Sequence, residues 1–211
     1  MKETDSKVPA GEVVRQLILV RHSVPVQDGE VPASQWRLSE EGRRRCEALA
    51  AWLAEYEPAV VVSSVEPKAM ETAQIVAVRL GIPWETMDDL HEHERPLPGL
   101  APSREAFEAQ VIHLLQEPGE LVFGAETGEE ARERFAEAIE QVLDKHRAGN
   151  VAVVTHGTVM SLFVSRVAGV DPVRFWQGLG LPAVAVLSLP DLELLEVAGD
   201  VASPPPPETG G

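Results

Sequence analysis

The stretch from Leu17 to Pro25 constrains the fold more than any other part of the chain. It begins with four apolar residues, Leu-Ile-Leu-Val, and no polar residue interrupts them. Such a run is typical of a strand buried on both faces, as in a parallel sheet with helices above and below it. The run ends on Arg21 and His22. Because ligands bind beyond the carboxyl ends of such strands, we expect both side chains at a site; the alternative is a surface pair that caps the strand.

Two later apolar runs repeat this arrangement. Residues 59–62 end on a pair of serines, and residues 151–155 end on His156, with a helical pattern after each. The carboxyl ends of parallel strands meet at one edge of the sheet. We therefore expect His22 and His156 to face the same crevice.

Helical patterns lie between the apolar runs. Ser39 is a typical N-cap, and Thr127 with Glu130 fits a capping box. Residues 82–123 are interrupted by prolines and contain one predicted helix, at about 103–116, while residues 184–197 predict a hairpin at the sheet edge. The expected fold class is α/β, a three-layer sandwich. Its central sheet is mostly parallel, with helices on both faces and a loop and helix insertion over the strand carboxyl ends. The predicted inward faces of three helices are Gly42, Cys46, Leu49, Ala50 and Leu53; Ala69, Ala73, Val76, Ala77 and Leu80; and Ala131, Phe135, Ala138, Ile139 and Val142.

The length of 211 residues suits one α/β core and is short for two domains. We predict a single domain over residues 16–200. Residues 1–15 mix charges with proline and glycine, which indicates a loose leader, and the proline-rich residues 201–211 indicate a disordered tail.

Composition excludes several classes of function. A net charge of −16 argues against a nucleic-acid partner, because phosphate backbones are bound by basic surfaces. There is no apolar run long enough to span a membrane and no signal-peptide pattern, so we expect a soluble, cytoplasmic protein with no membrane partner. Cys46 is the single cysteine and cannot form an internal disulfide. Its place on an apolar helix face predicts a core residue.

Two polar segments are open to more than one interpretation. Lys68 lies at the start of a predicted helix, where it and the helix N-terminus could hold an anion, or where it could be a solvated lysine. The segment 88–95 contains His91 and His93 among several carboxylates. A general acid is the favoured interpretation; a metal site and a solvated charged loop are the alternatives.

Several short motifs, taken together and in order, resemble those of one known family. They are Leu19-Val20-Arg21-His22-Ser23, Leu38-Ser39-Glu40-Glu41-Gly42, Ser63-Ser64-x-x-x-Lys68-Ala69-x-Glu71-Thr72-Ala73, Leu90-His91-Glu92, Glu126-Thr127 through Arg134, and Thr155-His156-Gly157. The family that they resemble is the histidine phosphatase superfamily, the phosphoglycerate-mutase-like fold. In the order given, the motifs are similar to its Arg-His-Gly signature, its Leu-Thr/Ser-x-x-Gly helix start, its Ser-Ser-x-x-x-Arg-Ala-x-Glu-Thr-Ala segment, its Leu-x-Glu acid position, its Gly-Glu-Ser-to-Arg helix and its second histidine motif. The resemblance covers about residues 17–190.

The resemblance implies a role for each of these positions. His22 would be the nucleophile that forms a phosphohistidine, and Glu92 the proton donor, with Glu94 as the second choice. Arg21, Lys68 and His156 would bind the phosphoryl oxygens with neither a metal nor a cofactor.

Two positions depart from the family pattern. Ser23 stands where the family has glycine and is predicted to contact substrate. Lys68 stands where the family has arginine, so one point charge replaces a bidentate fork.

The predicted function is metal-independent hydrolysis of a small phosphorylated substrate. A phosphoglycerate-type mutase is one alternative, although the short insertion and the residues after His22 match the longer mutase signature poorly. A non-catalytic domain that only binds a phospho-ligand, weakened by Lys68, is the other. The substrate's identity and the oligomeric state are left open.

Overall fold

The computed structural model describes residues 15–95 and 103–202. In this part of the chain a single mixed sheet has the strand order β3-β2-β4-β1-β5-β6. The strands β3, β2, β4 and β1 are parallel to one another, whereas β5 and β6 are antiparallel to their neighbours. The strands are β1 (Gln16–Arg21), β2 (Pro58–Ser63), β3 (Trp84–Thr86), β4 (Asn150–Thr155), β5 (Ala183–Ser188) and β6 (Leu194–Ala198).

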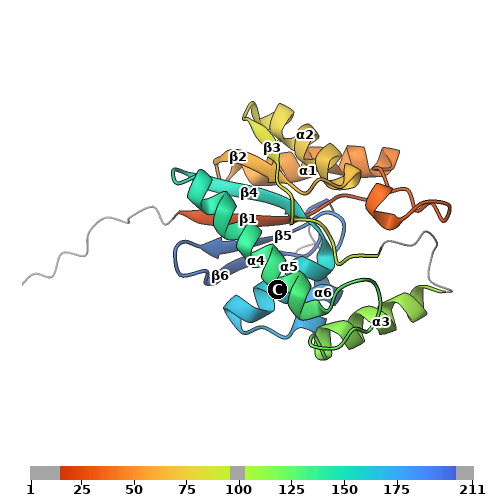
Figure 1. The fold of residues 1–211 in the computed structure, drawn as a ribbon. Helices are drawn as coiled ribbons and strands as arrows, with labels where there is room; N and C mark the ends of the chain where they lie inside the picture. The colour runs from red at the N-terminus through yellow and green to blue at the C-terminus, as the bar shows by residue number, and fades with distance from the viewer. Residues whose placement is uncertain (1–14, 96–102, 203–211) are drawn as a thin grey trace, which may run out of the picture.

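Helices cover both faces of this sheet (Figure 1). One face packs against α1 and α2, and the other packs against α4 and α5, with α3 and α6 next to them. The predicted α/β fold is therefore confirmed. The helices are η1 (Ala33–Gln35), α1 (Glu40–Ala54), α2 (Pro67–Leu80), α3 (Arg104–Gln116), α4 (Gly128–Lys145), α5 (Gly157–Ala168) and α6 (Pro172–Gly178).

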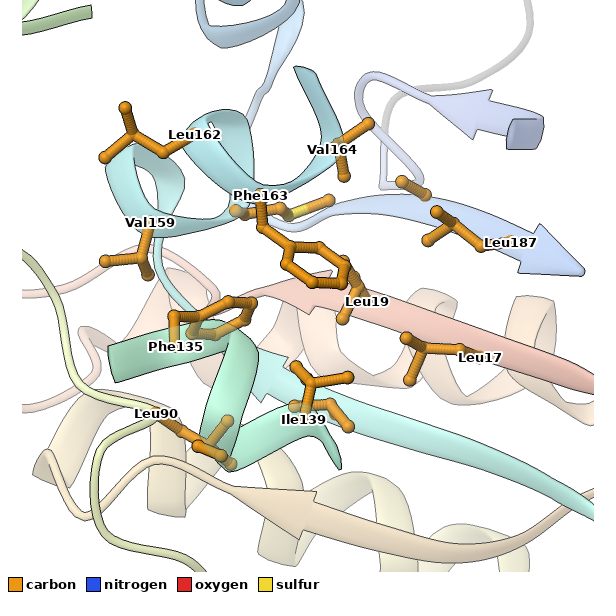
Figure 2. Close-up of a cluster of buried hydrophobic side chains, with 14 of the residues drawn as sticks. Leu17, Leu19, Leu90, Phe135, Ile139, Val159, Leu162, Phe163, Val164 and Leu187 are labelled. Atoms are coloured by element: carbon orange, nitrogen blue, oxygen red, sulfur yellow. The ribbon is translucent and has the colours of Figure 1, made fainter. Parts of the chain in front are cut away.

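The unbroken apolar run of β1 supplies both layers of the core. Because successive side chains of a strand point to opposite faces, Leu17 and Leu19 join the layer under α4 and α5, and Ile18 and Val20 join the layer under α1 and α2. Figure 2 shows side chains of α4 and α5 pointing toward Leu17 and Leu19. All four side chains are fully buried, so β1 is packed on both faces up to the point where its polar residues begin.

Most helix boundaries follow the expected signals. The side chain of Ser39 accepts a hydrogen bond from Gly42 N, and Thr127 and Glu130 form the expected capping box. The inward faces predicted for α1 and α4 are buried. Burial raises the pKa of the Cys46 thiol to about 11, which fits a core residue.

Three short elements were missed by the sequence patterns: η1, β3 and the helix α6. Each is too short to show a period of its own. The predicted leader lies outside the described residues except for Arg15, and the predicted tail does so except for Val201 and Ala202. Among the described helices, none has the length and apolar composition needed to cross a membrane.

Candidate active site

Three neighbouring strands deliver polar residues to one end of the sheet. The ends of β1 and β4 are joined by a hydrogen bond from His22 N to Thr155 O of 2.9 Å, and Ser64 N beyond β2 donates to Val154 O at 2.9 Å. The rings of His22 and His156 meet edge to face with centroids 5.2 Å apart. The structure thus brings together the two histidines that the strand pattern placed in one crevice.

His22 has the orientation that a nucleophile needs. Its Nδ1 lies 2.7 Å from Ser23 O. A carbonyl can only accept, so Nδ1 carries the proton and Nε2 keeps its lone pair. Burial, followed by the nearby His156 and Lys68, holds the pKa of His22 well below its usual range. The imidazole is therefore neutral and needs no base to activate it.

His156 is fully buried behind His22. Its Nε2 lies 2.8 Å from Ser64 Oγ and 3.7 Å from Glu66 Oε1, whereas its buried Nδ1 has no partner among the described residues. Burial and then Lys68 hold the pKa of His156 well below its usual range. Negative charge entering the crevice would favour protonation of this ring.

Glu92 lies on the loop before residue 96, and its carboxylate sits at the N-terminus of α5. Thr158 N donates to Oε2 at 3.1 Å, and Val159 N donates to Oε1 at 3.2 Å. Burial by itself would raise the pKa of Glu92, but Arg95, His156 and the bound N–H groups outweigh it and hold the pKa well below the usual range. Glu92 is thus ionised in the unliganded protein.

Arg134 of α4 fastens the loop that carries Glu92. Its guanidinium donates to the carbonyl oxygens of Asp89, at 2.7 Å, and His91, at 3.2 Å, and pairs with Glu126 at 2.6 Å. The sequence placed Arg134 in a family motif but did not predict this role. Only the packing of α4 against the loop shows it.

Glu94 has different surroundings from Glu92. Its side chain is 51% exposed and lies 3.6 Å from His91 Nε2. His93 turns away instead, because its Nε2 is 2.7 Å from Glu126 O. In the described part of the chain, no three His, Cys, Asp or Glu side chains gather where they could hold a metal ion.

Lys68 lies in the site rather than in solvent. Its side chain is 6% exposed, and Nζ donates to Ala33 O at 2.7 Å and to the carboxylate of Glu66. Glu66 also accepts a hydrogen bond of 2.9 Å from Glu92 N. Sequence reasoning overlooked Glu66. The signal in the sequence was the position of this carboxylate, two residues before Lys68 in the same motif.

Arg21 reaches the same end of the sheet from β1. Its Nη1 donates to Leu179 O at 2.5 Å, while its buried Nε has no partner among the described residues. The side chain passes so close to Gly157 that a Cβ there would come within 3.0 Å of Nε. A side chain at position 157 would therefore press on the guanidinium of Arg21.

The motifs found in the sequence belong to a known family model. The model of the histidine phosphatase superfamily (branch 1) matches residues 17–191. The chain belongs to this superfamily. It is similar to a metal-independent phosphoserine phosphatase of Arabidopsis thaliana, with 28% identity over 167 residues that cover 73% of this chain and 69% of that protein.

Solved structures share the fold of this histidine phosphatase. Bacillus stearothermophilus YhfR superposes with a TM-score of 0.71 at 21% identity, covering 90% of this chain and all of that one. A mycobacterial glucosyl-3-phosphoglycerate phosphatase has a TM-score of 0.67 at 19% identity, covering 83% of this chain and 90% of that one. These likenesses agree with the α/β sheet described above.

Ser23 does not fit the substrate-binding role predicted for it. It is fully buried, and its hydroxyl donates to Gly42 O at 2.8 Å while its N–H donates to Thr72 Oγ1 at 3.1 Å. A Cβ on Gly42 would come within 2.1 Å of Val24 O. Ser23 therefore links the end of β1 to the closely packed start of α1, and its hydroxyl is used in that contact.

A cleft of about 380 Å³ lies at this part of the molecule. Its lining includes Glu66, Lys68 and the segment 91–95. The structure thus brings together two neutral, buried histidines, buried cations and a carboxylate. The cleft lined by Lys68 and Glu92 is large enough for a small phosphorylated molecule.

Proposed function

We propose that this histidine phosphatase hydrolyses small phosphomonoesters through a phosphohistidine formed at His22. The observation that carries the proposal is the tautomer of His22. Its Nδ1 proton is held by Ser23 O at 2.7 Å, which leaves Nε2 free to attack phosphorus. Relatives named as phosphatases of phosphoserine and glucosyl-3-phosphoglycerate also support a small-molecule substrate.

The reaction divides into two steps. Nε2 of His22 bonds to phosphorus, the bond from phosphorus to the ester oxygen breaks, and that oxygen takes a proton from Glu92. Water then attacks the phosphohistidine, gives a proton back to Glu92, and releases inorganic phosphate and neutral His22. Arg21, Lys68 and His156 donate to the phosphoryl oxygens, whose charge must be stabilised throughout.

Glu92 must gain a proton before it can act as the acid. It is ionised when the cleft is empty, because the N-terminus of α5 and Arg95 stabilise its charge. The negative charge of a bound phosphate raises the pKa of this carboxyl, and a phosphomonoester monoanion brings the proton with it. The acid is thereby formed only when substrate is present.

Trapping the intermediate tests this function. The protein is mixed with a ³²P-labelled aryl phosphate, and the reaction is quenched under alkaline conditions, in which phosphohistidine is stable. We expect label on His22, and none in His22→Ala. His113→Ala is the matched control, because His113 is a half-exposed histidine on α3. Turnover without labelled histidine, or activity retained in His22→Ala, would overturn the mechanism.

The same preparation separates the alternatives. A phosphatase releases phosphate from p-nitrophenyl phosphate, is inhibited by vanadate and keeps its activity in EDTA. A binding domain retains vanadate but releases nothing. A mutase transfers its phosphoryl group between positions of phosphoglycerate faster than to water. Loss of activity in EDTA, restored by zinc or magnesium, would instead point to a metal bound by His91 and His93.

A further inference from the structure

Ser64 is a fully buried serine that the proposed reaction does not use. It directly follows β2, and its N–H donates to Val154 O at 2.9 Å, which fastens it to the neighbouring strand β4. Its Oγ lies 2.8 Å from Nε2 of His156. Glu66 N donates to the same oxygen at 3.2 Å. The hydroxyl is therefore in contact with one of the side chains proposed to bind the phosphoryl group.

Counting donors and acceptors gives the direction of the contact between Ser64 and His156. A neutral imidazole carries one N–H, on either Nδ1 or Nε2. If Nε2 carried it, Ser64 Oγ would accept twice, its own proton would have no acceptor among the described residues, and the buried Nδ1 would lack a donor. If the hydroxyl donates to Nε2 instead, only the N–H on Nδ1 is left without a partner. The second arrangement leaves fewer buried polar groups unpaired.

The N–H that is left over suits an anion. It can donate to a phosphoryl oxygen, whereas a ring nitrogen with a lone pair in its place would repel that oxygen. Glu66 Oε1 is 3.7 Å from Nε2, beyond hydrogen-bond distance, so a hydroxyl and not a carboxylate contacts the other side of the ring. A hydroxyl orients the imidazole without the negative charge that would attract a second proton to it. His156 is therefore a neutral donor before substrate enters.

We propose that Ser64 is a positioning residue for His156: its hydroxyl donates to Nε2, keeps the proton on Nδ1 and so presents an N–H to a phosphoryl oxygen. The inference rests on the proposed function, in which His156 binds that oxygen. The two histidines then carry their protons on the same nitrogen for opposite purposes. Ser23 O holds the Nδ1 proton of His22 and leaves a nucleophile free, whereas Ser64 occupies Nε2 of His156 and leaves a donor free.

The tautomer can be read from ¹⁵N NMR of the full chain with labelled histidines, in which the His156 signals are those missing from His156→Asn. We expect a protonated Nδ1 and an unprotonated Nε2 in the unliganded parent at neutral pH, and an Nδ1 signal that shifts with vanadate. In Ser64→Ala the proton should be shared between the two nitrogens. A proton on Nε2 of the parent overturns the proposal even if Ser64→Ala fails to fold. So does an Nδ1 signal that is unchanged at a vanadate concentration that inhibits turnover.

Kinetics test whether Ser64 acts through His156. Ser64→Ala should lower kcat/KM on p-nitrophenyl phosphate by about tenfold, as loss of one hydrogen bond to the phosphoryl group would give. In a His156→Asn background the same change should cost less than about twofold, because the ring that Ser64 positions is gone. Equal losses in both backgrounds would show a merely structural role and overturn the proposal.

Ser161→Ala is the matched control. Ser161 is also fully buried, but its hydroxyl donates to Gly157 O of its own helix at 2.7 Å, so its removal should leave the tautomer of His156 as it is in the parent. Turnover by a parent with the proton on Nε2 refutes only the role of Ser64. A parent that has the expected tautomer but does not hydrolyse p-nitrophenyl phosphate refutes the proposed function, and the role of Ser64 with it.

Discussion

Lys68 donates from its ammonium to the carboxylate of Glu66, two residues earlier in the chain, and both side chains are buried in the cleft. Glu66 also accepts from the N–H of Glu92, so one carboxylate connects the predicted phosphate-binding cation with the loop of the predicted acid. Lys68, which stands where the family has arginine, thus has an acidic partner. Two predictions follow from this pair.

Removing the ammonium should weaken catalysis without abolishing it. We expect Lys68→Ala to lower kcat/KM on p-nitrophenyl phosphate by about ten- to a hundredfold, since a charge-assisted hydrogen bond is lost. Lys68→Arg should stay within about threefold of the parent, because Ala33 O and Glu66 can accept from a guanidinium as well. Parent-like activity of Lys68→Ala would place Lys68 outside the phosphate site.

Removing the negative charge of Glu66 should strengthen anion binding. In Glu66→Gln the amide oxygen can still accept from Glu92 N, while the charge that competes with phosphate for Lys68 is gone. We expect the vanadate inhibition constant to fall by about tenfold. Glu71→Gln, also on α2 but paired with Arg43, is the control. Weaker inhibition would show that Glu66 is needed chiefly to position Lys68.

The surroundings of Glu92 and Glu94 predict that only the mutation of Glu92 slows catalysis. Loss of a general acid typically costs roughly 10²–10⁴-fold and costs least when the leaving group needs no proton. Glu92→Gln should therefore slow an alkyl phosphate much more than p-nitrophenyl phosphate, and Glu94→Gln should change neither by more than about threefold. Steady-state kinetics on both substrates measure this. Equal losses in Glu92→Gln, or the larger loss in Glu94→Gln, would reassign the acid.

The buried histidines make stability depend on pH. Burial lowers the pKa of both His22 and His156, so the folded protein leaves them neutral where the unfolded chain binds protons. The unfolded state then holds more protons below about pH 6.5, and the free energy of unfolding should fall as pH decreases through that value. Each histidine contributes a slope of at most about 1.4 kcal/mol per pH unit.

Urea unfolding between about pH 7.5 and 5 checks this slope. We expect the double variant His22→Gln with His156→Gln to have a flatter profile than the parent. The profile is not fully flat, because burial lowers the pKa of His93 as well. His113→Gln, at a half-exposed position of α3, is the matched control. An unchanged slope in the double variant would mean that these rings take up protons as readily in the folded state.

Local patterns were sufficient for the central strands and for the two histidines. A parallel strand buried on both faces needs an uninterrupted apolar run, and the polar residues at its carboxyl end follow directly in the sequence. Residues 17–22 and 151–156 therefore predict both a buried strand and the histidine at its end. The helix starts at Ser39 and Thr127 were equally local, because a cap and its partner are three residues apart. The order of the strands was not predictable in this way, since it depends on contacts between distant segments.

The α/β class, the central strands and the family motifs can be predicted from the amino-acid sequence, because each depends on residues that are neighbours in the chain. The contacts of the polar side chains are visible only in the folded protein. Folding buried Ser23 under α1, paired Lys68 with Glu66, and fastened the Glu92 loop to Arg134. The physical reason is that a polar group's role follows from its hydrogen-bond partners and its distance from water. For these residues the hydrogen-bond partners lie on other helices and strands, or are brought close by a turn of the chain. A local sequence pattern therefore does not predict them.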